Sequence, residues 1–157
     1  NGQARRDLAL RLKWPNDILI GRDKVGGILV ESTQSGGAVL AVVGIGLNIA
    51  DHPCGLSVAA THLRAHGDFP DPREFLDQLA IAFEAWLDVW RAGEGFNAIR
   101  QAWLANAGSM GEACTVNTGD GPVSGTFAGI DADGALLVTH KNGGVRRYTF
   151  GDVTLSP

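Results

Sequence analysis

The 157-residue sequence contains little cysteine, only Cys54 and Cys114, and no pair at the CxxC spacing. Disulfide scaffolds need several cysteines, so none is expected, and a reducing compartment, the cytoplasm, is favoured. No run reaches the roughly 18 uncharged apolar residues that a membrane span needs. Methionine occurs once, at Met110, and the sequence starts with Asn1. We expect the chain to begin inside a longer protein.

Basic residues are not in excess. The formal net charge is −4, which does not favour nucleic acid as a partner. The charge is unevenly distributed, because residues 1–34 hold six basic and four acidic residues while the rest of the chain is net negative. An anionic ligand is therefore expected at the N-terminal end.

The overall composition is that of a globular protein, with 45% apolar and 19% charged residues. Glycine is the exception, since its 22 residues are roughly twice the usual share. So much glycine predicts many tight turns, or backbone that lies close to a ligand.

The first third of the chain is typical of an antiparallel meander. Apolar, β-rich segments at residues 8–14, 18–20, 24–31 and 39–49 are separated by short turn sequences. Connections of hairpin length favour antiparallel pairing of these strands.

The middle of the chain is predicted to be helical. Asp71 can cap a helix, Pro72 suits its first position and Glu74 its third. Apolar residues then recur at steps of three and four up to Gly93, which predicts one apolar helix face: Phe75, Leu79, Phe83, Trp86 and Trp90. A second helix is expected over residues 96–104. The tryptophans at helical spacing are expected in the core.

The last fifty residues predict a small closed barrel. Short strands at residues 113–116, 123–130, 135–139 and 145–150 are separated by Asp-Gly and Asn-Gly pairs, which accept the positive φ angles of hairpin turns. The boundary is placed at residues 107–109, giving domains over 1–106 and 107–157.

Three motifs follow one another in the N-terminal third: KWPND at residues 13–17, KVGGILVE at 24–31 and VGIGLN at 43–48. In this order and spacing the set resembles the biotin–protein ligase family. The tail, with GTFAGID at residues 125–131 and GALL at 134–137, resembles the C-terminal SH3-like domain of the same family.

The resemblance implies an α+β fold: a mixed, mainly antiparallel sheet with helices, of the class II synthetase-like type shared by biotin and lipoate ligases, followed by an all-β SH3-like barrel. Residues 1–106 are then the C-terminal portion of the catalytic domain. The family's upstream Gly/Arg-rich loop, of the G-R-G-R-x-G-R type, is absent from the sequence. The implied activity is ATP-dependent adenylation of biotin, with ATP and Mg²⁺ as the substrate complex, and transfer to a lysine of a carboxylase's biotin-acceptor domain. A homodimer is also compatible with the family.

The residue types suit that chemistry. Its first step brings an anionic carboxylate to an anionic phosphate, so positioning and fixed positive charge contribute most. Lys24 is the candidate catalytic and substrate-binding residue, bridging the carboxylate and α-phosphate oxygens. Asp17 is the second catalytic candidate, either holding Mg²⁺ or orienting water or Lys24. Without the motifs, Lys24 would be a solvated lysine and Pro-Asn-Asp an Asx turn.

The remaining candidate residues belong to substrate binding. Asn16 and Asn48 each offer a paired donor and acceptor to a nucleotide; a strand-end cap is the alternative for Asn48. Gly27, Gly44 and Gly46 lie inside predicted strands, where glycine suggests close approach by another group. They are expected to form the base of a groove for biotin and the adenylate. The alternative is that a tryptophan of a helix packs into the space left by the missing side chains.

A zinc site is the less favoured interpretation of one further set: His52, Cys54, His62 and His66. No tight cysteine pair supports it, so no tightly bound metal is expected, and His62 and His66 are expected on an exposed helix face. Two other functions stay open. One is a lipoate or octanoate ligase, against which the KWPND segment argues; the other is a non-catalytic binding or dimerisation module.

Overall fold

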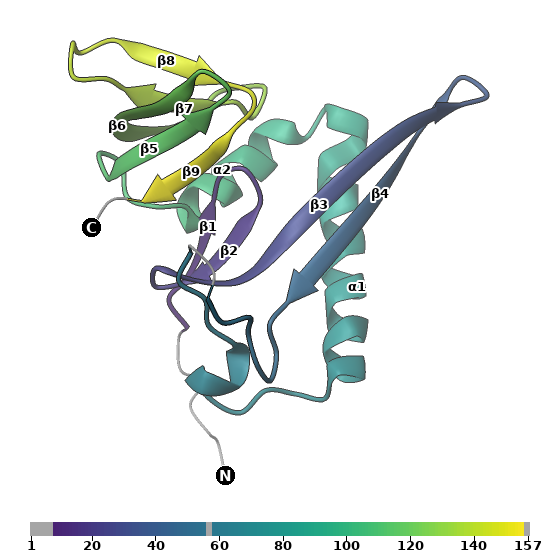
Figure 1. Ribbon diagram of the computed structural model, residues 1–157. Coiled ribbons are helices and arrows are strands. Elements are labelled where there is room, and N and C mark those ends of the chain that lie inside the picture. The colour runs from purple at the N-terminus through teal and green to yellow at the C-terminus, as the bar shows by residue number, and fades with distance from the viewer. Residues whose placement is uncertain (1–7, 56–57, 156–157) are drawn as a thin grey trace. The chain divides into compact units, whose positions relative to one another are not determined.

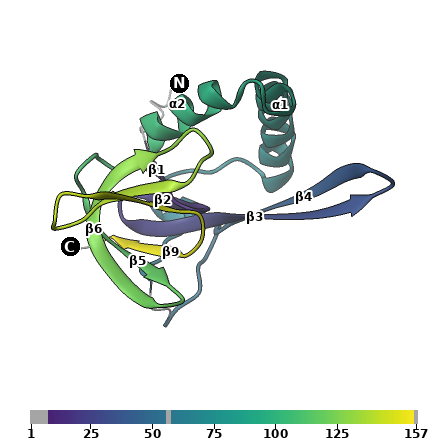
Figure 2. The ribbon, with the colours of Figure 1, turned by 90° about the horizontal axis from the view of Figure 1, so that it is seen from above.

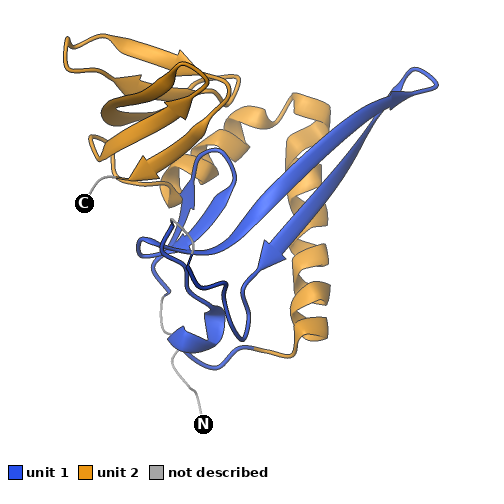
Figure 3. Cartoon of the chain, viewed as in Figure 1, with its two compact units in different colours: residues 1–69 blue, residues 70–157 orange. Residues whose placement is uncertain are grey.

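The computed structural model describes residues 8–55 and 58–155. The chain divides into two compact units, residues 1–69 and 70–157 (Figure 3). Each unit has its own sheet.

The first unit is built on a four-stranded antiparallel sheet in the order β1-β2-β3-β4 (Figure 1). Its strands are β1 (Leu10–Lys13), β2 (Asp17–Ile20), β3 (Asp23–Ser35) and β4 (Ala38–Leu47). Short connections hold neighbouring strands in sequence order, which confirms the predicted meander. The β3–β4 turn uses Gly36 and Gly37 at positive φ, which glycine adopts without a Cβ clash.

After β4, the chain returns to the start of β3. A 3-10 helix, η1 (Leu63–His66), follows a segment in which Ala60 forms a parallel bridge with Lys24. Leu63 is buried with Ile20 and Val25, forming the small core of this unit. The core therefore lies under the end of the sheet that carries the predicted motifs.

The second unit begins with α1 (Pro72–Trp90), η2 (Arg91–Gly93) and α2 (Phe96–Asn106). The Asp71 side chain accepts a hydrogen bond from the backbone N–H of Arg73, so the predicted cap is present. The turn between the helices needs Gly95, because a Cβ there would lie 1.6 Å from the Val89 carbonyl oxygen.

Five short strands complete this unit: β5 (Ala113–Thr118), β6 (Gly121–Ile130), β7 (Leu136–Thr139), β8 (Val145–Tyr148) and β9 (Asp152–Leu155). They pair antiparallel in the order β8-β7-β6-β5-β9. Strand β6 is strongly curved (Figure 2) and pairs with β5 in its first part and with β7 near its end. The sheet buries one residue from each of its three middle strands: Val116 on β5, Phe127 on β6 and Val138 on β7.

The strand predicted over residues 145–150 is too long. β8 ends at Tyr148, and β9, which the sequence analysis did not predict, pairs with β5. Gly151 separates the two at φ +119, a backbone conformation that breaks a continuous strand.

Helix α2 packs on this sheet. The Arg100 Nε–H donates to the carbonyl oxygens of Ile130 (2.8 Å) and Asp131 (3.0 Å), and the Trp103 ring contacts Phe127. The compact units divide between Phe69 and Pro70, whereas the domain boundary proposed at residue 107 lies within the second unit and stays a prediction.

The expectation that the helical tryptophans are core residues is wrong for α1. Trp86 is 47% exposed and Trp90 43%. A 3.6-residue apolar period predicts which face of a helix is apolar, but it does not predict that the described residues of the helix's own unit bury that face.

Candidate functional site

A row of facing residues crosses the sheet of the first unit. Lys13 on β1 pairs with Asp17 on β2, Asp17 with Gly27 on β3, and Gly27 with Gly46 on β4. Directly opposite residues project to the same face of a sheet. The row therefore places two charged side chains beside two positions without side chains.

The charged part of the row is an ion-pair cluster around Asp17, whose side chain is buried. One carboxylate oxygen lies 2.7 Å from the Lys13 Nζ, and the other is paired with the Lys24 Nζ. Burial by itself would raise the pKa of Asp17, but hydrogen bonds from Lys13 and Lys24 outweigh it and hold the pKa below its ordinary value. Two ammonium groups thus contact the one carboxylate.

This depressed pKa predicts an acid-sensitive contribution to stability. The carboxylate stabilises the fold fully above its ordinary pKa of 3.8, and the contribution is lost as pH falls through the lower folded value. The difference in unfolding free energy between the unchanged chain and Asp17→Asn is therefore expected to shrink between pH 6 and pH 2. Urea titrations at several pH values measure it. A difference that grows towards low pH would contradict the assignment.

The backbone of Lys24 is fixed on both sides. Its N–H donates to the Ala59 carbonyl and its carbonyl accepts from the Thr61 N–H, both at 2.9 Å. The side chain is 40% exposed, and its Nζ lies 3.6 Å from where a Cβ of Gly27 would stand. The ammonium group thus lies over the glycine part of the row, held by Asp17 and open to solvent.

The two asparagines differ in their surroundings. Asn16 is exposed, and its Nδ2 donates to the Ile28 carbonyl at 2.7 Å, which fixes the start of β2 against β3. Asn48 follows β4; its Nδ2 donates to the Thr61 carbonyl at 2.9 Å, and its backbone carbonyl accepts from the Leu63 N–H. The contacts of Asn48 are those of the strand-end cap considered above. Its role in nucleotide binding stays a prediction.

The strand glycines fall into two classes. A Cβ at Gly26 would lie 2.5 Å from the Gly46 carbonyl oxygen, so this glycine is required by packing. At Gly44 and Gly46 the nearest described atoms would be 3.8 and 3.9 Å away, both carbonyl oxygens of β3. A methyl group would fit there, so the chain's own described packing does not explain these two glycines.

This contrast predicts opposite effects on stability. Gly26→Ala is expected to lower the unfolding free energy by about 1–3 kcal/mol, because backbone must move to accept the methyl group. Gly46→Ala is expected to change it little. Parallel urea titrations of the two variants test this, and equal losses would refute the distinction.

Comparisons with known proteins agree with these motifs. Residues 3–48 match the model of the biotin/lipoate A/B protein ligase family, and residues 109–156 match that of the biotin protein ligase C-terminal domain. The chain is 45% identical over 139 residues to the biotin–[acetyl-CoA-carboxylase] ligase of Paracoccus denitrificans, covering 82% of this chain and 56% of that protein. The chain belongs to the biotin protein ligase family.

Two further relatives of this family support the assignment. The bifunctional ligase/repressor BirA of Bacillus subtilis is 33% identical over 92% of this chain and 46% of its own length. The solved biotin protein ligase of Aquifex aeolicus in complex with biotin and ATP matches with a TM-score of 0.76 at 25% identity, over 94% of this chain and 62% of that one. The α+β fold with an SH3-like C-terminal part is thus confirmed. The chain spans about half the length of these curated relatives.

Of the expected site residues in this biotin ligase family chain, Lys24, Asp17 and Gly27 come together directly, and Gly46 continues their row. Gly44 lies two residues further along the same face of β4. Sequence reasoning missed Lys13, which is 9% exposed and paired with Asp17. The signal was available, since Lys13 precedes Asp17 by four residues across a Pro-Asn turn.

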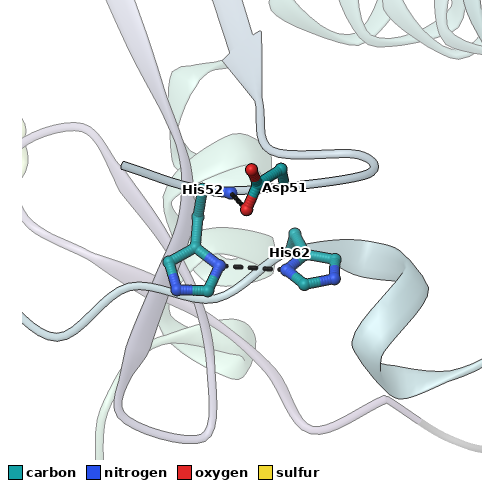
Figure 4. A group of neighbouring side chains, drawn as sticks. All are labelled: Asp51, His52 and His62. Atoms are coloured by element: carbon teal, nitrogen blue, oxygen red, sulfur yellow. Dashed lines mark hydrogen bonds between the residues drawn. The ribbon is translucent and has the colours of Figure 1, made fainter. Parts of the chain in front are cut away.

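The expectation that His62 and His66 lie on an exposed helix face is wrong. His62 and His66 are half-buried: the His62 Nδ1 lies 2.9 Å from the His52 Nδ1, and the His66 Nε2 lies 2.8 Å from the Thr61 Oγ1. The reason is that η1 is a single short turn held by backbone bonds to Asn48 and Ile49, rather than a free amphipathic helix. Asp51, His52 and His62 form a separate group (Figure 4).

No helix of residues 8–55 and 58–155 combines the length and apolarity needed to cross a bilayer. Cys54 and Cys114 are both free thiols.

Proposed function

We propose that this chain carries part of the active site of a biotin–protein ligase. The reaction joins the biotin carboxylate to the α-phosphate of ATP with release of pyrophosphate, and then passes the biotinyl group to a lysine amine with release of AMP. The observation that carries the proposal is the Lys24 ammonium, held over the glycine row by the buried carboxylate of Asp17.

The exposed lysine of the cluster suits an anionic ligand. Lys13 and Lys24 both contact the Asp17 carboxylate, and Lys24 is the member whose ammonium is open to solvent. A positive group fixed before the reaction stabilises the charge that develops on the phosphate oxygens without reorganising in the transition state. Both carboxylate oxygens of Asp17 already contact lysines, which favours orienting Lys24 over holding Mg²⁺ as its role. Mg²⁺ would then arrive bound to ATP.

Gly27, Gly46 and Gly44 form a strip of backbone without side chains, which we call the strip. A flat or extended ligand can lie close to the backbone there. The Lys24 ammonium lies next to Gly27, 3.6 Å from where a Cβ would stand. We assign the strip to biotin and the adenylate, with Asn16 at its edge and Asn48 beyond the end of β4.

The same strip predicts a selective effect of one methyl group. Gly46→Ala is expected to fold normally but to bind biotinyl-adenylate about tenfold more weakly, because the methyl group occupies space that the ligand needs. Isothermal titration calorimetry with a non-hydrolysable biotinyl-adenylate analogue measures the change. Affinity equal to that of the unchanged protein would exclude the strip from the ligand site.

We infer that the acceptor is the biotin-acceptor domain of a carboxylase and that the protein acts in the cytoplasm. The Paracoccus relative is named for the acetyl-CoA carboxylase that it modifies. A homodimer is included in the proposal because both faces of the β3–β4 hairpin carry exposed apolar residues, among them Leu29, Val30 and Val43.

Calorimetry with biotin, with lipoate and with a non-hydrolysable ATP analogue tests the function. Binding of biotin and the nucleotide, with adenylate formed from ATP, supports the ligase. Preference for lipoate would instead indicate a lipoate-activating enzyme, because the family model matched by residues 3–48 covers both biotin and lipoate ligases. Absence of binding by all three would favour a non-catalytic module.

A further inference from the structure

A second group of side chains converges outside the cluster around Asp17. Asp51, His52 and His62 each bring one potential ligand atom within 4.8 Å of the other two. The two imidazoles face each other through their Nδ1 atoms at 2.9 Å, and the Asp51 carboxylate lies nearby (Figure 4). The group comes from two segments ten residues apart in sequence.

The backbone holds these segments side by side. The Leu63 N–H donates to the Asn48 carbonyl at 2.9 Å, and the Arg64 N–H donates to the Ile49 carbonyl at 3.0 Å. Leu63 is buried in the core of the first unit, and Ile49 packs against that core. The Asp51 Oδ1 accepts from the backbone N–H of His52, which orients the carboxylate. The convergence is therefore built into the fold rather than made by two free side chains.

We propose that Asp51, His52 and His62 form a binding site for a divalent transition metal, with Zn²⁺ as the expected ion. Two imidazole nitrogens and one carboxylate oxygen are ligands that Zn²⁺ takes in proteins, at about 2.0–2.2 Å. In tetrahedral geometry, two such nitrogens stand about 3.3 Å apart. The Nδ1 atoms thus need to separate by only a few tenths of an ångström, while the carboxylate closes by rotation of its side chain.

Three protein ligands leave at least one position for water, so the site is of the open kind rather than a closed structural site. The ion would tie the segment after Asn48 to the segment after Thr61. Thr61 donates to the carbonyl of Lys24, so this tie lies one residue away from the backbone bond that holds Lys24. The proposal does not depend on the ligase function, because it concerns the binding of metal alone.

Equilibrium dialysis of the full 157-residue chain against ZnCl2 tests the site, with bound zinc quantified by atomic absorption. One zinc per chain is expected. His52→Gln and His62→Gln are each expected to weaken binding at least ~10-fold, the scale of losing a metal-site contact. His140→Gln is the matched control, because His140 lies in the second unit and bonds to Tyr148; its zinc affinity should equal that of the unchanged chain.

Nitrogen-15 NMR of the histidine rings gives a test that needs no variant. Zinc should shift the Nδ1 resonances of His52 and His62 and leave those of His66 and His140 in place. Substoichiometric binding, zinc affinity in either glutamine variant equal to that of the unchanged chain, or shifts confined to other histidines would overturn the proposal.

Discussion

Replacing Lys24 by alanine is expected to slow the formation of biotinyl-adenylate at least ~100-fold, the scale of losing one preorganised charged contact in the transition state. The ammonium is the exposed member of the cluster and extends over Gly27, so its removal takes away the positive charge nearest the proposed phosphate position. Biotin-dependent exchange of pyrophosphate into ATP measures this step in a ligase that contains the chain.

Lys141→Ala is the matched control for this experiment, since Lys141 is an exposed lysine of the second unit. It should exchange pyrophosphate at the unchanged rate. If Lys24→Ala also retained near-normal exchange, Lys24 would have no part in the chemistry, whatever its contacts. Because Lys24 is 40% exposed, its loss should leave the thermal unfolding midpoint nearly unchanged, which separates an effect on catalysis from an effect on folding.

Replacing Asp17 by alanine is expected to have the largest effect on stability, a loss of about 3 kcal/mol in the free energy of unfolding. The carboxylate is buried and compensates two ammonium groups, and Lys13 is itself only 9% exposed. Removing one partner of a buried ion pair leaves a buried charge without that compensation, which typically costs about 3–5 kcal/mol. Denaturation in urea at pH 7 measures the change.

Asp88→Ala provides the comparison, because Asp88 is an exposed carboxylate on α1. Its expected change is within about 0.5 kcal/mol, as for most surface substitutions. The double variant Lys13→Met, Asp17→Leu should recover part of the loss, since an apolar pair removes both charges from the interior. Equal stability of Asp17→Ala and the unchanged chain would mean that the cluster contributes nothing to the fold.

Local patterns in the sequence were sufficient for most elements. The helix at Pro72 was predicted by its cap and its apolar period, and the hairpins by their Asx-Gly turns, because these signals are contained within a few residues. Strand β9 was missed because it is only four residues long and pairs with β5, which lies far from it in sequence. Pairing between segments far apart in the chain produces no local sequence pattern in either segment that would predict it.

In the candidate site, too, some features were predictable from the sequence and others depend on contacts between distant residues. The family resemblance made Lys24 and Asp17 the two catalytic candidates, with orientation of Lys24 as one of several roles open to Asp17, and the structure pairs their side chains. Spacing did not distinguish Gly26, which packing requires, from Gly46, where a methyl group would fit; only the distances across β3 and β4 separate them. Likewise, nothing in the sequence paired His52 with His62, because their contact depends on the backbone bonds between residues 48–49 and 63–64.

The long β3–β4 hairpin has a practical consequence for handling the protein. Beyond the short strand β2, each of its two strands pairs only with the other within the described sheet, and apolar side chains on both faces are exposed: Leu29, Val30, Val39, Leu40, Val42 and Val43. An isolated two-stranded ribbon is marginal in water, and an uncovered apolar edge templates intermolecular pairing. The amide protons of this ribbon should therefore exchange with deuterium faster than those of the five-stranded sheet of the second unit. In concentrated samples, aggregation should begin by pairing of this ribbon between molecules.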